Sequence, residues 1–227
     1  MIKGIIFDLD DTLYPEIDYV FSGFSKVCNK ISIDYGLDYY EIYEEIKLLF
    51  KEDSKFVFNR LLELYAINYP NDYIIDLLLL YRSHKPEISL YNDAEYILNY
   101  LKKKNYKLGL ITDGYSNSQQ IKIDKLELKN YFDSIIITDE LGRENWKPSK
   151  LPYIKCIEEI QVEFKETVYI GDNVKKDFIS ANRLSMKTVF IQRENQIYQK
   201  YQNLPSIYYA DYEIKSLKDI IYLFNME

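Results

Sequence analysis

The sequence predicts an α/β protein in which a doubly wound parallel sheet has helices on both faces and an all-helical segment is inserted after the first strand. Three observations support this prediction. A short apolar run opens the chain, residues 16–85 keep helical periodicity, and from residue 86 onward short apolar runs alternate with helical stretches. Repeated strand–helix units of this length are typical of a parallel sheet. We therefore expect an α/β unit of residues 1–15 and 86–227, and a helical unit of residues 16–85.

The first predicted strand is the apolar run Gly4–Phe7, which is too short for a helix and is therefore expected to be buried. Three carboxylates follow it within four positions, Asp8, Asp10 and Asp11, and Thr12 comes next. Burying that much negative charge is costly unless a cation or a reaction uses it. Because ligands bind at the carboxyl ends of strands in open α/β sheets, this loop is the first candidate site. We expect Asp11 itself to form a turn or a helix cap.

The inserted segment shows apolar residues at three- and four-residue spacing, which is typical of helices that bury one face. No alternating strand pattern interrupts it. The apolar stripes are Val20, Phe24, Val27, Cys28 and Ile31; Ile42, Ile46, Leu49 and Phe50; Phe58, Leu61, Leu62 and Tyr65; and Ile75, Leu78, Leu79 and Tyr81.

After the insertion, apolar runs of strand length recur between helical stretches. The predicted strands are residues 107–111, 134–138, 168–170 and 188–191, with an edge strand near 207–209. The predicted helices are residues 94–101, 117–126, 153–160, 176–184 and 217–224.

Polar residues follow several of these strands. Thr112 follows the second strand, Asp172 and Asp177 follow the fourth, and Lys147 precedes a helix. Because the carboxyl ends of parallel strands meet at one edge of the sheet, these side chains should converge on Asp8. The ligands on offer are oxygens, with no cluster of His or Cys in the sequence. This donor set favours Mg²⁺ over zinc.

Four motifs, in order along the chain, resemble those of the haloacid dehalogenase superfamily, in its phosphatase branch with a helical cap of the C1 type. Asp8–Thr12 is similar to the family's Asp-x-Asp-x-Thr loop, and Thr112–Gly114 is similar to its hydroxyl-bearing second motif. Lys147–Pro148 is similar to the third motif, and Gly171–Asp177 matches Gly-Asp-x4-Asp. The resemblance covers the core from Ile2 to Ile191, while the cap matches in position and helical character.

The resemblance implies a role for each motif. Asp8 would be the nucleophile that forms an aspartyl-phosphate, and Asp10 would be the general acid and base. Mg²⁺ would be held by the Asp8 carboxylate, the Asp10 backbone carbonyl and Asp172. Thr112 and Lys147 would bind the phosphoryl oxygens.

Two further carboxylates accompany these motifs. Asp113 is included among the phosphate-binding residues, although many relatives have Asn at this position. Its extra charge would disfavour highly anionic substrates, or would bind an amine or hydroxyl of the substrate. Asp177 is expected to orient metal-bound water or Lys147 and not to contact the metal directly.

The predicted function is Mg²⁺-dependent hydrolysis of a phosphomonoester through an aspartyl-phosphate. The substrate would be a small metabolite: a sugar, polyol or amino-alcohol phosphate, or a nucleoside monophosphate. A phosphomutase or phosphotransferase on the same fold is the alternative, and a non-catalytic binding protein is another. The presence of both Asp8 and Asp10 disfavours the non-catalytic protein. A dehalogenase needs neither Asp10 nor a metal ligand such as Asp172, so the presence of both residues disfavours that activity.

Composition narrows the partners and the setting. The 227 residues carry a net charge of −7 at pH 7, which argues against binding to nucleic acid. No apolar run is long enough to span a membrane, and the first residues lack the layout of a signal peptide. The two cysteines, Cys28 and Cys156, fit no metal-ligand spacing, so we expect a reduced, cytoplasmic setting. The sequence leaves the oligomeric state open.

Overall fold

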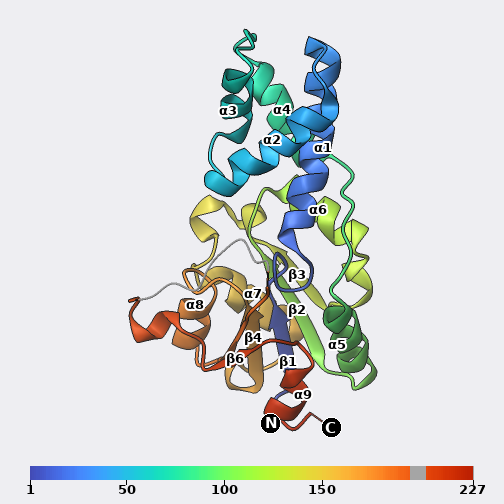
Figure 1. The fold of residues 1–227 in the computed structure, drawn as a ribbon. Helices are drawn as coiled ribbons and strands as arrows, with labels where there is room; N and C mark the ends of the chain where they lie inside the picture. The colour runs from blue at the N-terminus through green and yellow to red at the C-terminus, as the bar shows by residue number, and fades with distance from the viewer. Residues whose placement is uncertain (195–202, 227) are drawn as a thin grey trace. The chain divides into compact units, whose positions relative to one another are not determined.

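The computed structural model describes residues 1–194 and 203–226 (Figure 1). Its internal contacts divide the chain into two compact units, residues 1–17 with 88–227 and residues 18–87. The predicted boundaries lie after residues 15 and 85, two residues earlier in each case.

The first unit is built on a parallel sheet of six strands in the described residues, in the order β3-β2-β1-β4-β5-β6. The strands are β1 (Gly4–Phe7), β2 (Lys107–Thr112), β3 (Ser134–Ile137), β4 (Thr167–Gly171), β5 (Lys187–Ile191) and β6 (Tyr212–Ile214). The chain moves outward from β1 to β3 and then returns to β4 on the other side of β1. This reversal makes a topological switch point beside the carboxyl end of β1, where open α/β sheets bind their ligands. The predicted doubly wound parallel sheet is confirmed.

Helices cover both faces of this sheet, as right-handed crossovers between parallel strands require (Figure 1). They are α5 (Asn92–Lys103), α6 (Ser116–Lys125), α7 (Leu151–Ile160), α8 (Phe178–Arg183) and α9 (Asp219–Leu223). On one face, α7 and α8 pack on the strands through a buried cluster that includes Ile6, Ile111 and Phe178. The approach of α7 to β2 is close, because a Cβ on Gly109 would overlap the Cys156 Sγ.

The predicted edge strand at residues 207–209 is wrong. Residues Ser206–Tyr208 form a short 3₁₀ helix, and the edge strand is Tyr212–Ile214, which pairs in parallel with β5. The physical reason lies in the backbone hydrogen bonds. The Asn182 side chain donates to the first and the last carbonyl of the 207–209 run, at 2.8 and 2.9 Å. These carbonyls are therefore occupied by a side chain in place of a neighbouring strand.

The second unit is helical, as predicted. Its helices are α1 (Glu16–Tyr35), which begins in the first unit, α2 (Tyr39–Glu52), α3 (Val57–Leu64) and α4 (Tyr73–Ser83). The buried Phe24 ring contacts the rings of Phe50, Phe58 and Tyr81. The Asp38 carboxylate caps α2 by accepting from a backbone N–H of its first turn at 2.9 Å. Within the described residues, every helix is too short or too polar to cross a membrane.

Candidate active site

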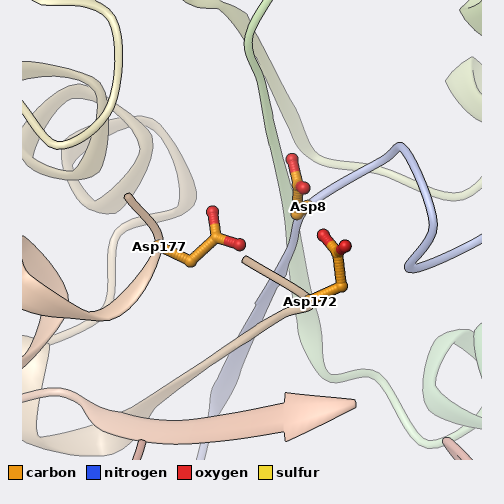
Figure 2. A group of neighbouring side chains, drawn as sticks. All are labelled: Asp8, Asp172 and Asp177. Atoms are coloured by element: carbon orange, nitrogen blue, oxygen red, sulfur yellow. The ribbon is translucent and has the colours of Figure 1, made fainter. Parts of the chain in front are cut away.

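The centre of the site is a cluster of three buried carboxylates at the carboxyl edge of the sheet (Figure 2). Asp8 directly follows β1, Asp172 directly follows β4, and Asp177 directly precedes α8. The parallel pairing of β1 with β4 brings the first two together, and the Asp8 backbone N–H donates to the Ile170 carbonyl at 2.8 Å. One oxygen from each of the three carboxylates lies within 4.8 Å of the other two. Figure 2 shows the three carboxylate groups on the same side of the view, with Asp8 between Asp177 and Asp172.

Lys147 is the cation of this cluster, and its side chain is fully buried. Its ammonium group contacts Asp8 Oδ1 at 2.6 Å, Asp177 Oδ1 at 2.8 Å and the Tyr169 hydroxyl at 3.2 Å. The Tyr169 hydroxyl in turn donates to Asp177 Oδ1 at 3.1 Å. Burial acts to lower the pKa of Lys147, but the carboxylates of Asp177 and Asp8 outweigh it and raise that pKa. Since an ammonium group has three N–H donors, these three contacts use all of them.

The cluster holds three carboxylates and one contacting ammonium group, so its negative charge is not fully neutralised. Burial raises the pKa of Asp8 to about 6, although the Lys147 ammonium group acts in the opposite direction. Burial, with the nearby Asp177 and Asp8, raises the pKa of Asp172 well above its usual range. Asp172 Oδ2 is buried and has no hydrogen-bond partner within residues 1–194 and 203–226. A buried, oxygen-only site with an unsatisfied carboxylate oxygen fits a hard divalent cation.

Asp10 lies in a separate set of contacts. Lys122, from α6, contacts Asp10 Oδ1 at 2.6 Å, and the Tyr14 hydroxyl donates to the same oxygen. The Gln119 side-chain amide, also from α6, donates to Asp10 Oδ2 at 3.3 Å. Burial acts to raise the pKa of Asp10, but Lys122 and Tyr14 together outweigh it and lower that pKa. These contacts therefore favour the ionised form of the Asp10 carboxyl group.

The end of β2 supplies a hydroxyl and a carboxylate with different surroundings. Thr112 is buried, and its hydroxyl has no hydrogen-bond partner in the described part of the chain, so it is available to a ligand. Asp113 Oδ1 instead accepts from the Thr138 hydroxyl at 2.7 Å and from the Lys147 backbone N–H at 3.1 Å. Burial acts to raise the pKa of Asp113, but Lys147 and Lys176 lower it overall.

Asp11 shapes the loop between β1 and α1. Its φ of 53° lies in the left-handed region, and its Oδ1 accepts from the Glu16 backbone N–H at 2.8 Å. It thus forms the turn and caps the start of α1, as expected from the sequence.

The structure therefore brings Asp8, Lys147, Asp172 and Asp177 into one cluster and places Asp10 beside it with partners of its own. Sequence reasoning missed Lys122, Tyr14, Gln119 and Lys176. A signal for two of them exists in α6, whose buried face includes Ser118, Gln119, Lys122 and Ile123. A helix that buries a lysine and an amide on one face indicates that they meet charged or polar partners.

Comparisons with known proteins agree with this geometry. A family model described as haloacid dehalogenase-like hydrolase matches residues 5–191. The chain is 32% identical to a glyceraldehyde 3-phosphate phosphatase of Methanocaldococcus jannaschii, covering 97% of this chain and 96% of that protein. It is 31% identical to a glyceraldehyde 3-phosphate phosphatase of Pyrococcus furiosus, covering 100% and 94% respectively. A solved haloacid dehalogenase-type phosphatase of Thermococcus onnurineus is 26% identical, with a TM-score of 0.65 over 100% of this chain and 99% of that one.

Proposed function

Because the chain belongs to the haloacid dehalogenase-like hydrolases and is a phosphatase of that family, we propose that it is a Mg²⁺-dependent phosphomonoester hydrolase acting through an aspartyl-phosphate. The observation that carries this proposal is the meeting of Asp8, Lys147 and Asp172 at the switch point of the sheet. A nucleophile, a cation and a metal-binding carboxylate are then present at the position where such sheets bind ligands.

The residues around Asp8 fit a magnesium ion. The Asp8 carboxylate, the Asp10 backbone carbonyl and the Asp172 carboxylate would hold it, and the buried Asp172 Oδ2 without a partner supports this assignment. When bound, Mg²⁺ offsets the repulsion between Asp8 and an incoming phosphate dianion and polarises the phosphoryl group. Asp177 we assign to the orientation of Lys147, since it contacts the ammonium group at 2.8 Å.

In the first chemical step, Asp8 attacks phosphorus, forming the Asp8 O–P bond as the bond from phosphorus to the leaving alkoxide breaks. Lys147 holds the attacking carboxylate in place through its 2.6 Å contact. The available Thr112 hydroxyl donates to phosphoryl oxygens as negative charge moves onto them. Covalent attack by a carboxylate divides one difficult hydrolysis into two easier steps.

Asp10 handles the protons. As a carboxylic acid it would give a proton to the leaving alkoxide, and as the carboxylate so formed it would take one, in the second step, from the water that attacks the aspartyl-phosphate, which restores the acid. Lys122 and Tyr14 favour the ionised form, which is the form that this second step needs. General acid–base help of this kind contributes roughly 10² to 10⁴ in rate.

We assign Asp113 a positioning role in place of the phosphate contact favoured by the sequence. Its Oδ1 already accepts from Thr138 and from the Lys147 backbone, which fixes the start of the lysine motif beside Thr112. An ionised carboxylate in this position would also repel a phosphate dianion.

For the substrate we propose a small phosphorylated metabolite, with glyceraldehyde 3-phosphate as the first candidate. The support is that two relatives named for this reaction are 32% and 31% identical across nearly the whole chain. We propose a cytoplasmic setting, in keeping with two cysteines that are buried and unpaired among the described residues.

A panel of phosphorylated metabolites, assayed with Mg²⁺ and with EDTA, tests this proposal. We expect release of inorganic phosphate, fastest from small sugar or triose phosphates, and loss of turnover with EDTA. Conversion of one phosphate ester to its isomer without phosphate release would indicate a phosphomutase. Turnover that survives EDTA would contradict the metal assignment, and no turnover across the panel would favour a non-catalytic protein.

A further inference from the structure

The three N–H donors of Lys147 are all engaged, whereas a second lysine of the site is held much more loosely. Lys176 lies in the loop between β4 and α8, one residue before Asp177, and its side chain is 28% exposed. Within residues 1–194 and 203–226, its ion pair is a single 3.5 Å contact with Asp113 Oδ2. That distance exceeds the usual range for an N–H···O hydrogen bond.

The charge of Lys176 nevertheless acts on both halves of the site. Burial raises the pKa of Asp8, and the Lys147 and Lys176 ammonium groups oppose that rise. The same Lys176 charge is among those that lower the pKa of Asp10 and of Asp113, against the effect of burial. Lys176 is therefore a loosely held cation near carboxylates of two separate contact sets.

We propose that Lys176 is a phosphoryl-binding cation, which exchanges its long contact with Asp113 for the oxygens of a bound phosphate group. This inference rests on the proposed function. Through its contact with Asp113, Lys176 reaches the end of β2, where Thr112, the residue before Asp113, has a hydroxyl without a partner among the described residues. A lysine ammonium is a compact point charge on a flexible stem, which suits movement from a carboxylate to a phosphate.

A simpler role for Lys176 would be to neutralise Asp113. An ionised Asp113 beside Thr112 would repel a phosphate dianion, and a nearby lysine would cancel that repulsion without contacting the ligand. The two roles give different results when Asp113 loses its charge. If Lys176 only neutralises, it becomes dispensable; if it binds phosphate, its loss still weakens binding.

The first experiment measures the affinity for inorganic phosphate, in the presence of Mg²⁺, by titration calorimetry. Lys176→Met should weaken phosphate binding by about ten- to a hundredfold, the range of one charge-assisted hydrogen bond. Lys176→Arg should keep binding within about tenfold. The matched control is Lys175→Met, which removes the same charge from the exposed neighbouring position and should change affinity less than about threefold.

The second experiment adds Asp113→Asn, whose side-chain carbonyl can still accept from Thr138 and the Lys147 backbone. The Lys176→Met/Asp113→Asn protein is compared with the single Asp113→Asn variant. It should still show most of the loss of phosphate affinity that Lys176→Met causes in the wild-type background. Recovery of wild-type affinity in the double variant would overturn the proposal, as would a Lys176→Met affinity equal to that of Lys175→Met. If Lys176→Met does not fold, Lys176→Gln carries the same prediction.

These measurements need no turnover. A protein that binds phosphate through Lys176 but hydrolyses nothing would contradict the proposed function and leave this inference standing. An active phosphatase whose phosphate affinity does not change when Lys176 is replaced would contradict this inference and leave the proposed function standing.

Discussion

Asp8 and Asp10 are two residues apart, and each contacts its own lysine at 2.6 Å, yet their pKa values are displaced in opposite directions. The difference lies in the partners around each carboxylate. Lys147 also contacts Asp177 and Tyr169, and the Asp177 charge acts to raise the pKa of Asp8. Asp10 accepts from the Tyr14 hydroxyl and the Gln119 amide in addition to its contact with Lys122.

This contrast shows how one loop can supply two carboxylates with different chemistry. Where environments push the pKa values of neighbouring groups apart, the groups can take separate acid–base roles. Lys147 does not offset the effect of burial on the pKa of Asp8, and Asp8 lies beside Asp172, which favours a metal ion and a nucleophilic role. The partners of Asp10 outweigh the effect of burial on its pKa, and we assign this carboxyl group to proton transfer. The predictions below test each side of this division.

The largest effect is expected at Asp8. Asp8→Asn removes the proposed nucleophile while keeping the size of the side chain, so turnover should fall by about 10⁴-fold or more. Steady-state assay of phosphate release measures this, with circular dichroism as the control for folding. Activity within about a hundredfold of the wild type would show that another group attacks phosphorus.

A smaller effect is expected on the Asp10 side. Lys122→Met leaves the half-buried Asp10 carboxylate without its cation, and kcat should fall about ten- to a hundredfold with little change in KM. Lys122→Arg should recover most of the loss, because it restores the charge. Lys125→Met, which removes an exposed lysine from the same helix, is the matched control and should be neutral. Equal effects of the two methionine variants would contradict a positioning role for Lys122.

The smallest effect concerns stability in the absence of metal. Burial and the nearby Asp10 raise the pKa of Glu16 to about 8, from an ordinary value of 4.5. Between these two pH values the unfolded chain has lost the proton and the folded protein keeps it, so stability should fall as the pH rises from 4.5 to 8. Glu16→Gln should remove this loss of stability with rising pH, because glutamine has no proton to lose in this range.

Thermal unfolding with EDTA at pH 5 and pH 8 measures the effect. The variant should differ little from the wild type at pH 5 and should be more stable at pH 8, with about 2–4 °C in Tm for each kcal/mol. A wild-type Tm that falls no further between the two pH values than that of Glu16→Gln would argue against a half-buried, protonated Glu16.

Much of the fold could be predicted from the sequence, because its strands are short apolar runs between amphipathic helices. The Gly4–Phe7 strand and the parallel, doubly wound arrangement follow from that pattern. The edge strand was misplaced because residues 207–209 are apolar and aromatic, while Asn182, distant in sequence, decides their hydrogen bonding. Such a contact has no local signal.

The family could also be predicted, since four motifs in order indicated it and the family model that matches residues 5–191 confirms it. The partners of the motif residues could not. Lys122 is 112 positions from Asp10 in the sequence, and its helix has an unremarkable polar composition until its buried face is known. Lys176 lies inside the fourth motif, but its contact with Asp113 depends on how β2 and β4 flank β1.

The most direct test of the division between Asp8 and Asp10 is to trap the aspartyl-phosphate in the Asp10→Asn variant. With an aryl phosphate, whose leaving group needs no proton, the first step should proceed and the second should stall without its base. Borohydride reduction after quenching converts an aspartyl-phosphate to homoserine, which peptide mass spectrometry locates. We predict homoserine at position 8 with Mg²⁺ and none with EDTA. Homoserine at position 172 or 177, or its absence in a variant that still releases the aryl alcohol, would contradict the account.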